Sequence, residues 1–289
     1  MLQKRASEPK ETLSPIVEVT PQAKKTAIRD PLQGKTGSLQ QVVDSTLDGT
    51  KGTYAVAIKN LKTGESYYTN EHASFYTASL YKLWIMVTTY KRIEEGVLTK
   101  DQILTEDVTT LNTAFQIASQ SAELTDGVVT YSVRDAVRQM ITISHNYAAM
   151  LLTEKIRLSS VARFLKENGL NESTVGTDGT SPKSTTADIA LFLEKLYNGD
   201  LANEAYTAEM IGVLKKQQLN EGIPKYLPDT SKVANKTGEI DGLKHDAGIV
   251  FSDTGDYILV VMSDSDNPKA AQERIALLSK GVFEYFNGK

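Results

Sequence analysis

Ser79 and Lys82 are the residues of this sequence whose types and spacing suggest catalysis. Lys82 carries the sole charge between Leu80 and Val87, a segment that is apolar on nearly every helical face. Such a helix is buried, and burying an unpartnered ammonium costs on the order of several kcal/mol, so Lys82 needs dedicated partners or a lowered pKa. Ser79 lies three positions before Lys82, and residues at spacing i, i+3 share one face of a helix. This spacing would place a nucleophile beside a base. Alternatively, Ser79 only caps the helix and Lys82 extends to the surface.

The composition narrows the classes of function. With 40% hydrophobic and 24% charged residues, the 289-residue chain is typical of a soluble globular protein. The net charge is −4 and the basic excess lies in the first 37 residues, so the acidic remainder argues against nucleic acid as the main partner. The sequence has no cysteine, which excludes disulfides and thiolate chemistry. Because His72, His145 and His245 lack metal-ligand spacing, we expect neither a metal nor another cofactor.

Residues 1–37 differ from the rest of the sequence. They are polar, contain four of the eight prolines and show no sustained periodicity, which predicts a flexible tail or stalk before a single domain at 38–289. The sequence contains no run of about 18 apolar residues, so no membrane span is predicted. Residues 1–30 also lack the apolar core of a signal peptide. A cytoplasmic protein and a chain separated from its export or anchor segment both fit this pattern.

The order of the predicted elements indicates an α+β fold with two lobes. A β-hairpin at 54–69 is followed by a long helical insert and then by three strands. We expect these strands and the hairpin to form one antiparallel sheet, flanked by N- and C-terminal helices, while about 71–216 forms an all-helical lobe. A cleft between the lobes is a natural site. The predicted helices cover 38–47, 75–90, 133–143, 147–156, 161–168, 188–196, 202–216 and 272–286, and the later strands cover 232–237, 246–252 and 257–262.

Two further motifs follow the SxxK motif of Ser79. The triplet SHN at 144–146 falls at a predicted helix junction, and the triplet KTG at 236–238 ends a predicted inner strand. In this order and context, the three motifs resemble the SxxK, SDN and KTG signature of class A β-lactamases and penicillin-binding proteins. Other copies of these motifs lie in the tail, in a turn or in the wrong order, at 7–10, 35–37, 62–64 and 265–267. The resemblance covers about 38–289 and implies a β-lactamase/transpeptidase-like fold.

The resemblance implies a serine acyl-enzyme mechanism. Ser79 would be the nucleophile, because the N-terminus of a helix favours the negative charge that develops there. Lys82 would take its proton, provided that Lys236 lowers the pKa of Lys82. Ser144 would pass the proton to the leaving nitrogen of the substrate.

The same resemblance assigns the substrate contacts. Asn146 would hold Lys82 and the substrate amide, while Lys236 and Thr237 would bind the substrate carboxylate. The backbone N–H groups of Ser79 and Glu239 would form the oxyanion hole. The implied partners are small-molecule β-lactams or D-Ala-D-Ala cell-wall peptides, so we expect an extracytoplasmic enzyme, acting as a monomer.

The sequence departs from the family pattern at three places. His145 stands where class A enzymes usually carry Asp, and Glu239 replaces a small residue. The third departure concerns Glu167, which matches the ExxLN segment that holds the deacylation base of fast β-lactamases. We interpret Glu167 as a solvated helix-end residue, because it lies in the last turn of a predicted helix that Gly169 ends. The alternative is that Glu167 is the deacylation base.

Without that base, the expected function is that of a D,D-peptidase-like enzyme that forms acyl-enzymes with β-lactams and releases them slowly. A true class A β-lactamase and a non-catalytic penicillin-binding sensor domain are the alternatives. The intact Ser79, Lys82, Ser144 and Lys236 argue against the sensor, since a pure binder does not need a proton relay.

Overall fold

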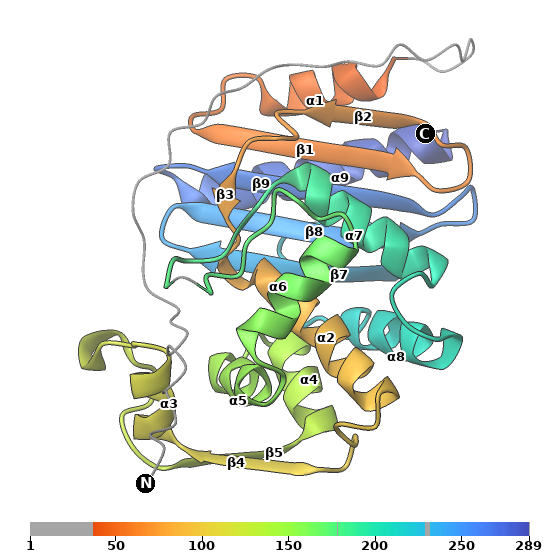
Figure 1. The fold of residues 1–289 in the computed structure, drawn as a ribbon. Helices are drawn as coiled ribbons and strands as arrows, with labels where there is room; N and C mark the ends of the chain where they lie inside the picture. Colours follow the sequence, from red (N-terminus) through yellow and green to blue (C-terminus); the bar gives the residue numbers. More distant parts are fainter. Residues whose placement is uncertain (1–36, 178, 229–231, 289) are drawn as a thin grey trace, which may run out of the picture.

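A five-stranded antiparallel sheet organises the computed structural model, which describes residues 37–177, 179–228 and 232–288. Its strand order is β2-β1-β9-β8-β7, so the N-terminal hairpin pairs with the C-terminal strands as predicted (Figure 1). The strands cover Thr53–Asn60 (β1), Ser66–Thr69 (β2), Lys232–Ile240 (β7), Leu243–Phe251 (β8) and Tyr257–Asp264 (β9). The α+β fold is thereby confirmed. The tail or stalk predicted at 1–37 lies outside the described residues except for Gly37, so its separation from the domain stays a prediction.

Each face of the sheet is covered by helices. Successive side chains of a strand point to opposite faces, and in β1 the pair Val56 and Ile58 packs toward α1 (Leu39–Leu47) and α9 (Pro268–Asn287). The alternate residues Ala55 and Ala57 belong instead to the larger core shared with α7 (Thr186–Asn198) and the helical lobe. Helices thus lie on both faces of the sheet (Figure 1). This explains why β1 and β9 are apolar along most of their length.

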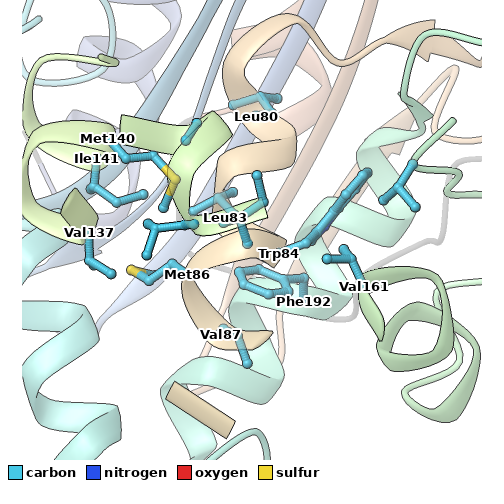
Figure 2. Close-up of a cluster of buried hydrophobic side chains, with 14 of the residues drawn as sticks. Leu80, Leu83, Trp84, Met86, Val87, Val137, Met140, Ile141, Val161 and Phe192 are labelled. Carbon is cyan, nitrogen blue, oxygen red and sulfur yellow. The ribbon is translucent and has the colours of Figure 1, made fainter. Parts of the chain in front are cut away.

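The helical lobe is built around α2 (Lys82–Glu94), which is buried from Lys82 to Tyr90 as the apolar sequence predicts. Figure 2 shows Leu83, Met86 and their neighbours packed against side chains of surrounding helices. The labelled partners lie on α4 (Val133–Thr142), α6 (Leu158–Glu167) and α7. α5 (Asn146–Ile156) and α8 (Glu204–Leu214) also pack against α2, and the lobe further contains α3 (Val108–Ala114) and the short 3-10 helix η2 (Ser119–Ser121). Within the described residues, no helix is both long and apolar enough to span a bilayer.

The helical prediction missed a surface hairpin. Strands β4 (Ile103–Asp107) and β5 (Val128–Ser132) pair antiparallel at the outer end of the helical lobe (Figure 1). Only one side chain of each strand, Leu104 and Val129, is buried, whereas Ile103 and Val128 are more than half exposed. A hairpin with so little buried surface gives no clear period-2 signal, which explains why the sequence did not reveal it.

Two expected elements near the motifs also differ. The stretch 75–90 is not one helix: β3 (Phe75–Tyr76) pairs with β6 (Lys183–Ser184), and the 3-10 helix η1 (Ala78–Tyr81) then carries Ser79 into α2. The KTG triplet does not end an inner strand. It lies within β7, which runs on to Ile240 and forms one edge of the sheet. Periodicity cannot show strand order, because order depends on pairing between distant segments.

Candidate active site

Ser79 is presented by a sharp turn between the two lobes. The backbone N–H of Thr77 donates to Pro182 O at 3.0 Å, which ties this segment to the loop 170–186. Ala78 has φ +44°, a left-handed conformation that non-glycine residues rarely adopt and that is seen at functional turns. Ser79 is partly exposed and lines two adjoining pockets of about 320 and 570 Å³. Ser79 therefore borders the space in which a substrate would lie.

Lys82 is fully buried at the start of α2. Its Nζ donates to Ser144 O at 2.6 Å, to Ser144 Oγ at 3.2 Å and to Asn146 Oδ1 at 2.6 Å. Burial lowers the pKa of Lys82 well below its usual range, the charge of Lys236 lowers it further, and Glu123 opposes the shift. The lysine thus has the dedicated partners that its sequence environment requires, and burial contributes more than the second cation.

Ser144 lies where α4 ends and α5 begins, in the left-handed region with φ +60°. Its hydroxyl oxygen accepts from Lys82 Nζ at 3.2 Å and from Lys236 Nζ at 3.1 Å, so it joins the two lysines. His145 caps α5, because its Nδ1 accepts from the backbone N–H of Ala148 at 3.1 Å. Burial lowers the pKa of His145, which favours the neutral imidazole that this cap requires. The departure from Asp thus keeps a capping side chain at the junction.

Lys236 reaches the same point from β7 and is fully buried. Besides Ser144, its Nζ contacts Thr237 O at 2.8 Å. Burial lowers the pKa of Lys236 to about 7, with an opposing effect from Asp246. Asp246 on β8 lies opposite Thr237, accepts hydrogen bonds from Asn235 Nδ2 and the Ile223 N–H, and has its pKa raised by burial to about 6. No motif in the sequence singles out this carboxyl.

β7 passes very close to the turn that carries Ser79. A Cβ on Gly238 would lie 2.8 Å from Thr77 O and 3.2 Å from Leu80 Cγ, so only glycine fits without a shift. The next residue, Glu239, forms an ion pair with Lys244 across the β7–β8 ladder, and its side chain is 63% exposed. Glu239 lines both pockets beside Ser79. Its side chain is therefore accommodated without displacing the strand.

Glu167 lies apart from this cluster. It is the last residue of α6, its side chain is exposed, and it belongs to neither pocket beside Ser79. Gly169 follows with φ +76°, as expected of a residue that ends a helix. Among the described residues that line the two pockets, the acidic ones are Glu221 and Glu239.

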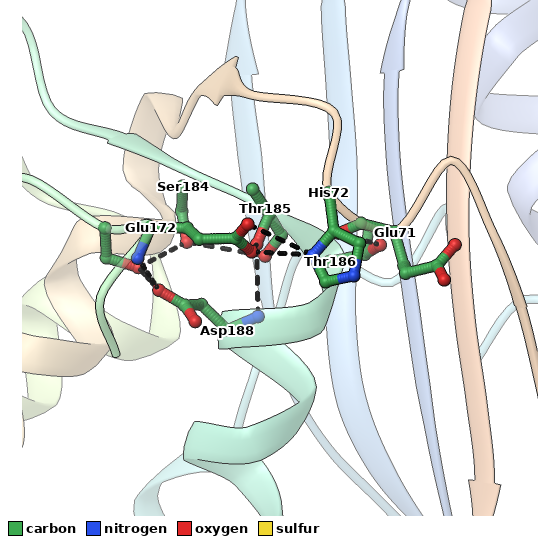
Figure 3. A network of polar contacts seen from close by, with 8 residues as sticks. Glu71, His72, Glu172, Ser184, Thr185, Thr186 and Asp188 are labelled. Atoms are coloured by element: carbon green, nitrogen blue, oxygen red, sulfur yellow. Dashed lines mark hydrogen bonds and ion pairs between the residues drawn. The ribbon is translucent and has the colours of Figure 1, made fainter. Parts of the chain in front are cut away.

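In the loop 170–186, the carboxylate of Glu172 makes its contacts away from the pockets beside Ser79 (Figure 3). Glu172 pairs with His72 Nδ1 at 3.0 Å and accepts from Thr185 Oγ1 at 3.0 Å. Asp188 accepts from Ser173 Oγ at 2.7 Å and from the Glu172 N–H at 2.9 Å. This network fixes the loop to the start of α7 and to the segment that follows β2.

One further residue of the site, Glu123, carries no signal in the sequence. Asn146 Nδ2 donates to Glu123 Oε1 at 2.6 Å. Glu123 lies in the loop between η2 and β5, is exposed and is 23 positions from its partner. A single glutamate in a polar loop carries no motif, so nothing in the sequence distinguished it from its neighbours.

The described residues hold no cluster of three or more metal-ligating side chains. What the site does bring together is two buried amines of lowered pKa, joined by the Ser144 hydroxyl, and Ser79, which lines a pocket together with Ser144. That set has the composition of an acyl-transfer site, in which an activated hydroxyl attacks and a positioned proton relay follows.

Comparison with known proteins agrees with this class of site. The model of the β-lactamase enzyme family matches residues 38–286, so the chain belongs to that family and is a serine hydrolase of the β-lactamase type. A search of curated proteins finds no match.

Solved structures resemble the fold at low sequence identity. A β-lactamase from Sphaerobacter thermophilus DSM 20745 is 21% identical with a TM-score of 0.76, covering 87% of this chain and 97% of that one. PBP-A is 22% identical with a TM-score of 0.73, covering 87% and 96%. A class A β-lactamase from Bacteroides cellulosilyticus DSM 14838 is 20% identical with a TM-score of 0.73, covering 87% and 98%. A mutant of PBP-A has been solved as an acyl-enzyme complex with penicillin G.

Proposed function

We propose that this protein forms an acyl-enzyme on Ser79 with β-lactams or D-Ala-D-Ala peptides and releases it slowly, as a D,D-peptidase-like enzyme does. The observation that carries the proposal is the Ser144 hydroxyl, whose oxygen lies within 3.2 Å of the Nζ atoms of two buried lysines next to the pocket of Ser79. Burying two amines at one hydroxyl lowers the pKa of both and has an electrostatic cost, so such an arrangement points to a function.

In the proposed reaction, Ser79 Oγ attacks the carbonyl carbon and its proton passes to the neutral Nζ of Lys82. As the carbon–nitrogen bond breaks, Ser144 gives its hydroxyl proton to the leaving nitrogen and takes one back from Lys82. The backbone N–H groups of Ser79 and Glu239 would hold the developing oxyanion. Asn146, Lys236 and Thr237 would bind the substrate, with the ammonium of Lys236 facing its carboxylate.

Slow release is proposed because the second half of the reaction needs an activated water. Glu167 is exposed at a helix end, and the pocket-lining Glu221 and Glu239 are already paired with Lys225 and Lys244. A water near the Ser79 ester would then lack a free carboxylate base from the described lining residues. Cell-wall peptides are the natural substrates of such chemistry, so we also propose that the protein works outside the cytoplasm, as a monomer.

Intact-protein mass spectrometry with benzylpenicillin tests the proposal. We expect the mass of one penicillin to appear within the first time points and to persist over hours. An adduct that forms and disappears with rapid turnover would instead identify a true class A β-lactamase. Complete absence of an adduct, in a protein shown to be folded by circular dichroism, would contradict acylation and favour the sensor domain. Ser121→Ala, which removes another serine from the same pocket, is the matched control and should label normally.

A further inference from the structure

Asn146 is held at both ends by opposite charges. Its Oδ1 accepts from Lys82 Nζ at 2.6 Å, and its Nδ2 donates to Glu123 Oε1 at 2.6 Å. The two ends of a carboxamide have almost the same shape, so hydrogen-bond partners decide which end points where. A turned amide would set its NH₂ group against the ammonium and its oxygen against the carboxylate. The pair Lys82 and Glu123 therefore selects one orientation of Asn146.

Glu123 is itself fixed by its chain neighbour. The backbone N–H of Leu124 donates to Tyr147 Oη at 3.1 Å, and Asn112 Nδ2 donates to Leu124 O at 2.9 Å. Tyr147 Oη also lies 2.9 Å from Asn112 Oδ1. Tyr147 is buried in α5 directly after Asn146. The loop that carries Glu123 is thus attached to the same helix turn as the amide that Glu123 binds.

We infer that Glu123 is a positioning residue of the acylation step: it orients the Asn146 carboxamide toward Lys82 and, through that amide, stabilises the ammonium form of Lys82. This inference rests on the proposed function for its kinetic consequence, whereas the effect on Lys82 is a property of the free protein. No motif or comparison above assigns a role to Glu123.

The charges around Lys82 make the sign of the effect clear. Lys236, on β7, is linked to Lys82 by the Ser144 hydroxyl. Burial lowers the pKa of His145 and raises that of Tyr81, so both of these neighbours favour their neutral forms. Asp246 acts on Lys236 from β8. Among the charges that act on Lys82, Glu123 favours its protonated form, while Lys236 and burial oppose it. Removing the carboxylate should therefore lower the pKa of Lys82 and move the acidic limb of acylation to lower pH.

Two substitutions separate charge from orientation. Glu123→Gln keeps an oxygen that can accept from Asn146 but removes the charge, so we expect the acidic limb to shift with little change in the maximal rate. Glu123→Ala also frees the amide, and we expect the maximal acylation rate to fall about tenfold or more, since small misplacements in a catalytic site are costly. In an Asn146→Ala background, Glu123→Ala should cause no further loss, because the orienting contact is already gone.

The experiment measures the second-order acylation rate of the full chain with benzylpenicillin between pH 5 and 9, together with the NMR titration of the Lys82 side chain without ligand. Asp126→Asn, which removes a carboxylate from the same loop, is the control and should change neither. A Lys82 titration and acidic limb that stay unchanged in Glu123→Gln would overturn the inference, as would a loss of rate that follows only a loss of thermal stability. Failure of the wild type to acylate would refute the proposed function alone, because the titration still decides the effect on Lys82.

Discussion

The surroundings of Lys82 and the loop 170–186 both border the pocket of Ser79, yet their polar groups are organised differently. Around Lys82, side chains from α2, the α4–α5 junction and β7 converge on the Ser144 hydroxyl. In the loop, Glu172 turns toward His72, and Ser173 donates to Asp188 at the start of α7 (Figure 3). Ser181 and Pro182 of the same loop border the pocket. The first arrangement suits proton transfer, and the second holds a segment in place. We infer that this chain can form an acyl-enzyme well without being equipped to hydrolyse it quickly.

The strongest test of this contrast is Ser79→Ala. We expect it to abolish covalent labelling by penicillin, because the nucleophile is removed and only a small hydroxyl is deleted from a partly exposed position. Mass spectrometry measures the labelling and circular dichroism checks the fold. If the variant is labelled as fully as the parent, another residue is the nucleophile, and the cluster around Lys82 is not the acylation site.

Lys82→Ala should have the next largest effect. Loss of a positioned base slows a reaction by on the order of 10²–10⁴-fold, and we expect a decrease of that size in the acylation rate by stopped-flow measurement. The buried cavity will also lower stability, so thermal denaturation is measured in parallel. An acylation rate equal to the wild type would show that another group removes the proton.

The pH dependence of acylation sharpens the comparison further. The proposed mechanism requires neutral Lys82 and charged Lys236, and the pKa of Lys236 in the free protein is about 7. The second-order rate should therefore fall as the pH rises above about 7 and also as it falls through the lowered pKa of Lys82, giving a bell-shaped profile. Lys236→Arg keeps a charge at all these pH values, so its profile should lose the alkaline limb. A wild-type rate that keeps rising up to pH 9 would contradict the charged role of Lys236.

For the pair of Glu172 and His72, which holds the loop 170–186, we expect a smaller effect, and one on stability rather than on acylation. Glu172 raises the pKa of His72, so the pair stabilises the fold below the usual pKa of histidine and this contribution is lost as the pH rises through the raised value. Both side chains are exposed, which limits the contribution to about 1 kcal/mol or less. His72→Asn should lower the Tm at pH 5.5 by at most about 4 °C and leave the Tm at pH 8.5 almost unchanged. An equal loss at both pH values would mean that the ion pair is not its source.

The smallest effect is expected for Glu167→Gln. The substitution keeps the size of the side chain and removes only a base, and an exposed helix-end residue outside both pockets should not affect the ester. Deacylation, followed by the loss of the penicillin adduct with time, should match the parent. Accumulation of acyl-enzyme in this variant alone, from a parent that turns over rapidly, would restore Glu167 as the deacylation base.

The sequence predicted those features that depend on local pattern. An apolar helix with one lysine, the SHN triplet at a helix junction and the KTG triplet on a strand were each readable from neighbouring residues, and the fold followed from element order. Features that depend on distant pairing were not readable. Glu123 meets Asn146 only through the folded loop, Asp246 gains its burial from the β7–β8 register, and β7 lies at the sheet edge because of strand order. The β4–β5 hairpin buries too little surface to leave a pattern.

The pairing of β1 with β9 has a consequence for how the protein is made. Thr53 lies beside Asp264, so a strand near the start of the fold cannot complete its ladder until β9, more than 200 residues later, has been synthesised. Until then, β1 has an open edge, and such edges are prone to pair with other chains. Long-range pairing of this kind also slows folding. During synthesis, Ser79 and Lys82 leave the ribosome long before Lys236, so a nascent chain holds half of a site that is completed only when β7 has formed.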